Sequence, residues 1–255
     1  MSCSRNSVYF VTDAHLGAGD DSRRREGELC ELLDSMMGDA AMVVFLGDMF
    51  DFWFSYKYVV PRGHVRLLGS MARLADAGVE LHFFVGNHDM WLFDYLEKEL
   101  GCIMHNDPEV LTFDGRRFLV GHGDGLGHAD RKYDMLRHLF RSRTCQWLLA
   151  LLPTRLTFAV ANSWSGSSRE SHLRKNPRNF EYQGDDQEGI VRYIRQRMAT
   201  EQFDYCLFGH RHTPLQKTLT VGDNSTEYVN VGDWLYNRTY AKYEQGRLAL
   251  LGNQL

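Results

Sequence analysis

The chain has 255 residues, of which 44% are hydrophobic, and its formal net charge is −4. This length suits one large globular domain with room for an insertion. The acidic balance lacks the basic signature of a general nucleic-acid binder, so we expect no nucleic-acid partner.

The five cysteines are scattered, odd in number and without Cys-x-x-Cys spacing. This pattern favours reduced cysteines in a cytoplasmic protein over a disulfide framework or a zinc knuckle. No apolar stretch precedes the first predicted strand, so we expect no signal peptide. No uninterrupted apolar run reaches the roughly 18 residues that a membrane span needs.

The first predicted strand, residues 8–11, is a short β-branched and aromatic run that ends in polar residues. Asp13 and His15 follow it with i, i+2 spacing, so in an extended segment their side chains point the same way. A carboxylate and an imidazole on one face form half of a metal site, although both are also common at strand ends. An amphipathic helix is predicted for residues 20–37. We interpret Arg23–Arg25 at its start as a solvated helix end rather than a phosphate contact.

The second and third predicted strands, residues 42–46 and 80–85, end in the same way. Asp48 follows the second strand after a glycine, at the carboxyl end where open α/β sheets place ligand sites. Asn87 and His88 follow the third strand. Because adjacent side chains diverge, an Asn87 that faces a metal leaves His88 facing the open side.

Two later strands complete the pattern. Residues 118–120 precede His122, and residues 205–208 precede His210 and His212, whose i, i+2 spacing lets both rings face one point. Any one of these residues is more often structural than a ligand. Their recurrence at five strand ends favours one shared metal site over five separate capping or core residues.

The remaining elements carry no ligand pair. Helices are predicted for residues 64–77 and 91–100, the first closed by a glycine. A last strand, residues 227–231, ends in Asp233. This aspartate has no partner at short spacing, and we interpret it as a turn residue.

These blocks resemble the motifs of the calcineurin-like metallophosphoesterase superfamily, which are D-x-H, G-D-x-x-D, G-N-H-[DE], G-H and G-H-x-H. All five are complete and in order: Asp13-Ala14-His15, Gly47-Asp48-Met49-Phe50-Asp51, Gly86-Asn87-His88-Asp89, Gly121-His122 and Gly209-His210-Arg211-His212. The resemblance implies a single α/β domain over residues 1–255, built as a four-layer α-β-β-α sandwich of two mixed sheets with an inserted helical lid.

Finer features resemble the branch that includes the UDP-2,3-diacylglucosamine pyrophosphohydrolases of lipid A synthesis. They are the block Asp13-Ala14-His15-Leu16-Gly17, a tryptophan shortly after Asp48, the triplet His122-Gly123-Asp124 and a long insertion before the fifth motif. One departure is His88, where the best-known members of that branch carry arginine. This difference bears on the substrate more than on the chemistry.

The resemblance implies two divalent metal ions. It assigns Asp13, His15, Asp48 and His212 to one ion and Asp48, Asn87, His122 and His210 to the other, with Asp48 as the bridge. Mixed oxygen and nitrogen ligands suit Mn²⁺ or iron better than Mg²⁺, and we expect Mn²⁺. Such an ion pair supplies the nucleophile for phosphoester hydrolysis, so no Ser or Cys nucleophile is needed.

Three further residues have two interpretations each. His88 is a candidate general acid or phosphate-oxygen donor. Asp51 orients it or is a simple helix N-cap. Asp124 holds His122 or caps a turn.

The insertion, about residues 126–183, is apolar and basic. Between His128 and Lys175 it carries nine Lys or Arg against three Asp or Glu, in a chain that is acidic overall. A basic apolar hairpin covers a lipid chain or lies on an anionic membrane; the alternative is an ordinary helical subdomain packed on itself. The resemblance favours the lid. Arg174 and Lys175 are candidate phosphate contacts, and Trp53 and Tyr133 line the substrate pocket or belong to the core.

The expected function is that of a two-metal hydrolase acting on the pyrophosphate of a UDP-linked glycolipid, UDP-2,3-diacylglucosamine. We expect a cytoplasmic protein, peripheral on the inner face of the inner membrane, whose oligomeric state the sequence leaves open. The alternatives are a phosphoprotein phosphatase or nucleotide phosphodiesterase of the same superfamily, and a non-catalytic scaffold on the same fold.

Overall fold

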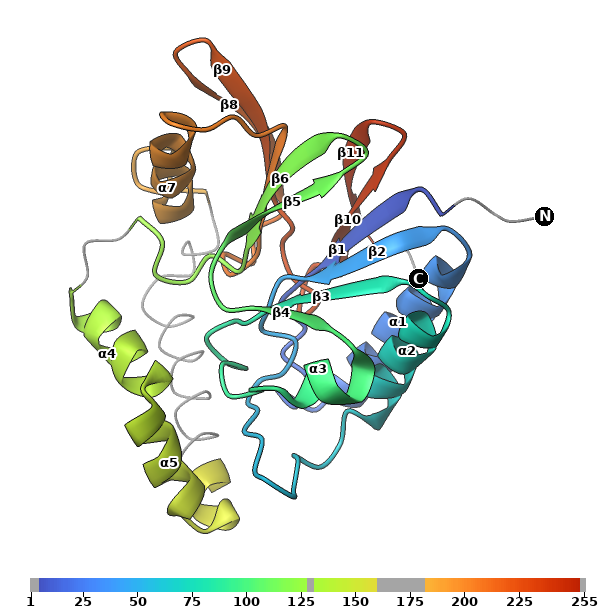
Figure 1. The fold of residues 1–255 in the computed structure, drawn as a ribbon, viewed down its shortest axis with the longest axis vertical. Helices are drawn as coiled ribbons and strands as arrows, with labels where there is room; N and C mark the ends of the chain where they lie inside the picture. The colour runs from blue at the N-terminus through green and yellow to red at the C-terminus, as the bar shows by residue number, and fades with distance from the viewer. Residues whose placement is uncertain (1–4, 128–130, 160–181, 253–255) are drawn as a thin grey trace.

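A computed structural model describes residues 5–127, 131–159 and 182–252, and side chains are described for all of these except residues 131–134 (Figure 1). Two sheets face each other. The first has the strand order β11-β10-β1-β2-β3-β4 and the second the order β5-β6-β7-β9-β8. Each combines parallel and antiparallel pairs, so both sheets are mixed, as predicted.

The strands of the first sheet are β1 (Ser7–Val11), β2 (Ala40–Phe45), β3 (Glu80–Phe84), β4 (Ile103–His105), β10 (Thr239–Glu244) and β11 (Arg247–Gly252). Those of the second are β5 (Glu109–Phe113), β6 (Arg116–Gly121), β7 (Tyr205–Phe208), β8 (Leu215–Val221) and β9 (Asn224–Asn230). The helices are α1 (Ser22–Ser35), the short 3₁₀ helix η1 (Met36–Gly38), α2 (Val65–Asp76), α3 (Tyr95–Leu100), α4 (Arg131–Arg141), α5 (Arg143–Leu151) and α7 (Gly189–Met198).

Strand β1 shows how the layers are built. Its side chains alternate, so that Tyr9 and Val11 pack in the core shared with the helices α1 and α2, while Val8 and Phe10 pack in the core between the two sheets. A third core joins α7 to the outer face of the second sheet through residues such as Ile194. These three cores make a four-layer α-β-β-α sandwich, which confirms the predicted fold class.

Helices α4 and α5 lie outside these layers and run down one side of the molecule (Figure 1). They follow β6 in the chain and belong to the insertion predicted between the fourth and fifth motifs. Within the described residues, no helix is both long enough and apolar enough to span a bilayer. The cysteines at positions 30, 102, 145 and 206 are free thiols, as predicted, and Cys3 lies outside the described residues.

The interpretation of the arginine run as a solvated helix end is wrong for Arg25. Its side chain is buried, donates to the carbonyl oxygens of His15 (3.2 Å) and Ala18 (2.6 Å), and pairs with Asp21. The turn after β1 leaves these carbonyls without sheet partners, and the buried guanidinium satisfies them. Its neighbours Arg23 and Arg24 are exposed, as the solvated interpretation requires.

Candidate metal centre

The loops at the carboxyl ends of β1, β2, β3, β6 and β7 converge on one place between the sheets. Three groups of potential ligands form there: Asp13, His15 and His212; His15, Asp48 and His88; and Asp48, His122 and His210. In each group one ligand atom per residue lies within 4.8 Å of the others. Elements far apart in the chain thus bring six of the seven predicted metal ligands, together with His88, into one cluster.

Asp48 lies between the two halves of this cluster. Its Oδ2 is 3.2 Å from His122 Nε2 and 3.8 Å from His15 Nε2. Asn87, the seventh predicted ligand, reaches the His122 half, with its Oδ1 3.3 Å from the same Nε2. In the other half, which contains His15 and His212, Asp13 Oδ1 lies 3.3 Å from His212 Nε2. One carboxylate therefore faces both halves, as a bridging ligand must.

The backbone at these positions is left-handed. Positive φ angles occur at Asp13 (51°), His15 (42°), Asp48 (52°), His210 (65°) and His212 (53°). For non-glycine residues this conformation costs about 1–2 kcal/mol per residue. The extended spacing assumed from the sequence is therefore not what brings Asp13 and His15 together; a tight turn does so. Backbone hydrogen bonds from Asp13 to the carbonyl of Gly47 (3.0 Å) and from His15 to that of Asp48 (2.9 Å) hold the turn.

The donor set fits divalent cations. Asp13 Oδ1 and both ring nitrogens of His15 are buried and have no hydrogen-bond partner among the described residues. Buried polar atoms normally have partners, so these atoms indicate a ligand that completes them. Carboxylate oxygens, imidazole nitrogens and an amide oxygen are the donors that Mn²⁺ and iron accept. The residues present can hold divalent metal ions.

The pKa values in the cluster show an environment that attracts positive charge. Burial opposes protonation of His15, but the nearby carboxylates of Asp13 and Asp51 outweigh it and raise its pKa to about 10. Burial likewise opposes the charge of Asp48, but nearby imidazoles such as His122 hold the pKa of that carboxyl well below its usual range. Burial and the neighbouring His122 lower the pKa of His210 to about 4. Carboxylates that stay ionised beside a neutral imidazole are suited to bind a cation.

Asp89 connects two of the loops, a role that its place in the third motif alone does not indicate. It is buried and accepts hydrogen bonds from the backbone N–H groups of Gly86 (2.8 Å) and Met49 (2.9 Å). It thereby ties the loop after β3 to the loop after β2. Burial and the charge of Asp48 raise its pKa to about 7.

Asp233 is a turn residue, as predicted, but it also has a partner. Its Oδ1 accepts from the backbone N–H of Asn237 at 3.1 Å. Its Oδ2 is 3.8 Å from His212 Nδ1, on the side of that ring away from Asp13. Carboxylates behind an imidazole ligand fix its orientation. Because β9 lies beside β7 in the sheet, the contact joins segments that are separate in sequence.

His88 and Asp51 are neighbours. The ring Nδ1 of His88 is 2.9 Å from the carbonyl oxygen of Asp51, so this nitrogen carries a proton and donates to it. The Asp51 carboxylate is 3.8 Å from the same nitrogen and 3.6 Å from His15 Nδ1. The helix N-cap alternative for Asp51 is wrong, because no helix begins in the turn that it occupies.

The predicted substrate contacts have different outcomes. Trp53 is completely buried, packs on Phe50 and Tyr95, and donates to Ser55 Oγ at 2.8 Å. It belongs to the core, so the prediction that it lines the substrate pocket is wrong. Tyr133 lies on α4, but its side chain lies outside the described residues. Arg174 and Lys175 lie outside them as well.

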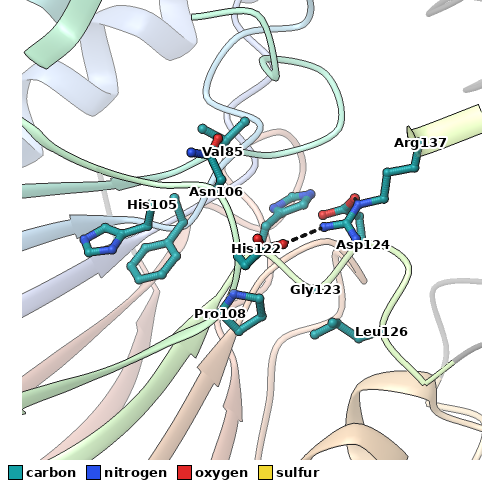
Figure 2. A pocket seen from close by; sticks show the side chains of 11 residues that line it. Val85, His105, Asn106, Pro108, His122, Gly123, Asp124, Leu126 and Arg137 are labelled. Atoms are coloured by element: carbon teal, nitrogen blue, oxygen red, sulfur yellow. Dashed lines mark hydrogen bonds and ion pairs between the residues drawn. The ribbon is translucent and has the colours of Figure 1, made fainter. Parts of the chain in front are cut away.

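A small pocket adjoins the centre beside His122 (Figure 2). Asn106 and Pro108 line it from the loop between β4 and β5, and Asp124 lines it from the loop after β6. Arg137 enters from α4, and its Nε lies 3.1 Å from Asp124 Oδ2. The insertion therefore contacts the loop that carries a predicted metal ligand.

Glycine at position 86 is required by close packing. A Cβ there would lie 2.5 Å from the backbone nitrogen of Asp48 and 2.8 Å from its Cγ. We expect Gly86→Ala to lower the free energy of unfolding by about 1–3 kcal/mol through overpacking and to displace Asp48. Gly27→Ala is the control, because in α1 the new methyl meets nothing within 4 Å in the described structure. It should stabilise by about 0.5–1 kcal/mol. Urea unfolding of both variants measures the difference, and equal midpoints would contradict the prediction.

Known proteins resemble this chain along most of its length. A family model described as calcineurin-like phosphoesterase matches residues 7–214. A UDP-2,3-diacylglucosamine hydrolase of Porphyromonas gingivalis is 37% identical over 257 residues, covering 96% of this chain and 97% of the relative. Another, from Pseudomonas putida, is 26% identical over 227 residues, covering 89% and 90%. Among solved structures, the E. coli phosphoesterase Yfce aligns with 96% of this chain and 92% of its own, with 12% identity and a TM-score of 0.47.

Proposed function

The chain belongs to the calcineurin-like phosphoesterase family and is a metal-dependent hydrolase, and from this premise we propose that it cleaves UDP-2,3-diacylglucosamine. The bond hydrolysed is the pyrophosphate, and the products are UMP and 2,3-diacylglucosamine 1-phosphate. The observation that carries the proposal is the near full-length similarity to the hydrolase of P. gingivalis. The complete set of converging donors supports the chemistry.

The metal assignment follows the two halves of the cluster. One ion would be held by Asp13, His15, Asp48 and His212, and the other by Asp48, Asn87, His122 and His210. The proposed ions are Mn²⁺, which this donor set suits. When bound, the ion pair lowers the pKa of water towards neutrality and neutralises charge on the phosphoryl oxygens.

The chain's own residues position the substrate for that chemistry. His88 is partly exposed at the edge of the cluster, and its ring lies 4.7 Å from that of His15. With Nδ1 committed to the carbonyl of Asp51, its Nε2 is the atom left to meet a phosphoryl oxygen. Asp51 fixes the ring orientation, so His88, as the imidazolium with a proton on each ring nitrogen, donates from Nε2 to the phosphate and Asp51 acts through it.

The insertion supplies the apolar contact that a diacylated substrate needs. Apolar side chains on and after α4 and α5 are exposed: Met135, Leu136, Leu139, Trp147, Leu148, Leu151, Leu152 and Leu156. A self-contained helical subdomain would bury such side chains, so their exposure favours a lid over acyl chains or a contact with lipid. The exposed arginines 143 and 155 add positive charge. These features support our proposal that the protein is cytoplasmic and peripheral on the anionic inner face of the inner membrane.

The test is a comparison of substrates that differ only in their acyl chains. We expect kcat/KM for UDP-2,3-diacylglucosamine to exceed that for the unacylated UDP-sugar by at least about 100-fold, since two buried acyl chains contribute far more than the 2.7 kcal/mol that this ratio represents. UMP release reports both reactions. Anionic vesicles should stimulate only the acylated reaction.

Three results would contradict the proposal. Equal rates on both substrates would favour a nucleotide phosphodiesterase, and preferential turnover of a phosphopeptide would favour a phosphoprotein phosphatase. A non-catalytic scaffold would hydrolyse none of the substrates and would retain fewer than one ion per chain after growth in Mn²⁺.

A further inference from the structure

The ion pair between Arg137 and Asp124 joins the helical insertion to the metal centre. Arg137 lies on α4, and its Nε is 3.1 Å from Asp124 Oδ2 (Figure 2). The Asp124 side chain is only 4% exposed and that of Arg137 is 19% exposed. Asp124 stands two residues after His122, a proposed metal ligand. The pair is therefore a nearly buried contact between the lid and the loop that carries this ligand.

The loop that carries Asp124 is held in position by hydrogen bonds and packing. The carbonyl of His122 accepts a hydrogen bond from the backbone of Gly209 (2.9 Å), and the His122 ring donates through Nδ1 to the carbonyl of Leu46 (2.7 Å). A Cβ at Gly123 would lie 2.7 Å from Ile190 of α7, so the loop is packed tightly from that side too. The carboxylate is thus a fixed point, and α4 is the element whose position it sets.

The other contacts of α4 are of a different kind, and they include a second pair of Arg137, from its Nη2 to the exposed Asp107 at 3.5 Å. Arg141, one helical turn further on, donates to the carbonyl of Asn106 (3.0 Å) and pairs with Asp107 (3.3 Å), whose side chain is 71% exposed. Phe140 accepts from Trp91 Nε1 through its carbonyl at 3.0 Å. Exposed pairs such as Arg141–Asp107 contribute little, whereas removing one partner of a buried pair leaves an uncompensated charge. Of these contacts, the pair of Arg137 with Asp124 is the one that depends on a buried charge.

We propose that Arg137 is a positioning residue that sets the distance between the lid and the metal centre. Arg137 holds α4 against Asp124. It thereby keeps the apolar face of the insertion at a fixed distance from the metal centre, so that the acyl chains and the pyrophosphate of one substrate molecule are bound at the same time. Arg137 touches neither the metal ligands' donor atoms nor the reacting atoms. The inference rests on the proposed function, because it concerns the acylated substrate of that same site.

The kinetic test compares Arg137→Met with Arg141→Met. We expect Arg137→Met to lower kcat/KM for UDP-2,3-diacylglucosamine about 100-fold, mainly through KM, because a small misplacement of a positioning element costs this much. Hydrolysis of bis-p-nitrophenyl phosphate, which lacks acyl chains, should change less than about threefold and also reports that the variant is folded. Arg141→Met should change both substrates less than about threefold. Arg137→Lys, which keeps the charge, should recover kcat/KM to within about tenfold of the original chain.

Hydrogen exchange provides a readout that needs no substrate. Amides of α4 should exchange at least about tenfold faster in Arg137→Met and at an unchanged rate in Arg141→Met. Equal exchange in the two variants would overturn the inference. An equal loss on the small ester and the acylated substrate would also overturn it, since Arg137 would then act on the metal centre and not on the lid. If the original chain hydrolyses the small ester but not the acylated substrate, the proposed function fails, and hydrogen exchange still decides the role of Arg137.

Discussion

Asp48→Ala is expected to abolish hydrolysis, with kcat reduced by about 10⁴-fold or more, while the fold remains intact. The reason is geometric. Asp48 Oδ2 faces His122 at 3.2 Å and His15 at 3.8 Å, so its removal takes a donor from both halves of the cluster at once. UMP release measures the activity, and metal analysis of the purified variant should show less than half of the bound Mn²⁺ of the original chain.

The control for this prediction is Asp34→Ala, which removes a carboxylate from a partly exposed pair with Arg73 on the helical face. Its activity and metal content should match those of the original chain within about twofold, because exposed pairs contribute little. Circular dichroism of both variants checks the fold. If the Asp48 variant keeps near-normal turnover or its full metal content, Asp48 does not bridge two ions.

His88→Ala is expected to lower kcat by about 10²–10³-fold with little change in KM, the magnitude typical of a lost donor to developing charge. The proton on Nδ1 is donated to the carbonyl of Asp51, so Nε2 faces the substrate. The metal content should be unchanged, because Asp48, His15 and the other donors remain. Steady-state kinetics with UDP-2,3-diacylglucosamine measures the effect.

His88→Arg separates the two roles considered for this residue. A guanidinium donates to phosphate oxygens as an imidazole does, but it does not release a proton near neutral pH. If His88 acts as a phosphate donor, the arginine variant should retain kcat within about tenfold of the original chain. A loss as large as that of His88→Ala would instead favour general acid catalysis.

The layers of the fold could be predicted from local patterns only in part. The runs that become β1, β2, β3, β6 and β7 are short, apolar and end at glycine or a polar turn, so their burial was visible in the sequence. Strands β10 and β11, the last two at one end of the first sheet, were missed because most of their residues are only half-buried. The pairing of β1 with β10, more than 200 residues away, is a tertiary choice that no local pattern specifies. The family resemblance supplied the two facing mixed sheets but not this strand pair.

The residues of the candidate site were predicted more accurately than the backbone geometry that brings them together. Residue type and position after each strand predicted a common metal site, and the structure brings those residues together. The stated cause, extended i, i+2 geometry, fails at Asp13, His15, His210 and His212, where the chain turns left-handed. The partnership of Asp233 with His212 was missed because it joins the ends of different strands. Arg25 was misjudged because a charged residue near a helix start is usually solvated.

Because the backbone is left-handed at five of the proposed ligands, the residue types at these positions in related chains should reflect whether the chain binds metal. Glycine adopts that conformation at little cost, so a lineage that abandons metal binding gains stability by substituting it there. Glycine at the equivalents of 13, 15, 48, 210 or 212 in a related chain is therefore expected to accompany loss of hydrolysis. A library of this chain selected for heat resistance alone should collect the same replacements, whereas one required to release UMP should reject them.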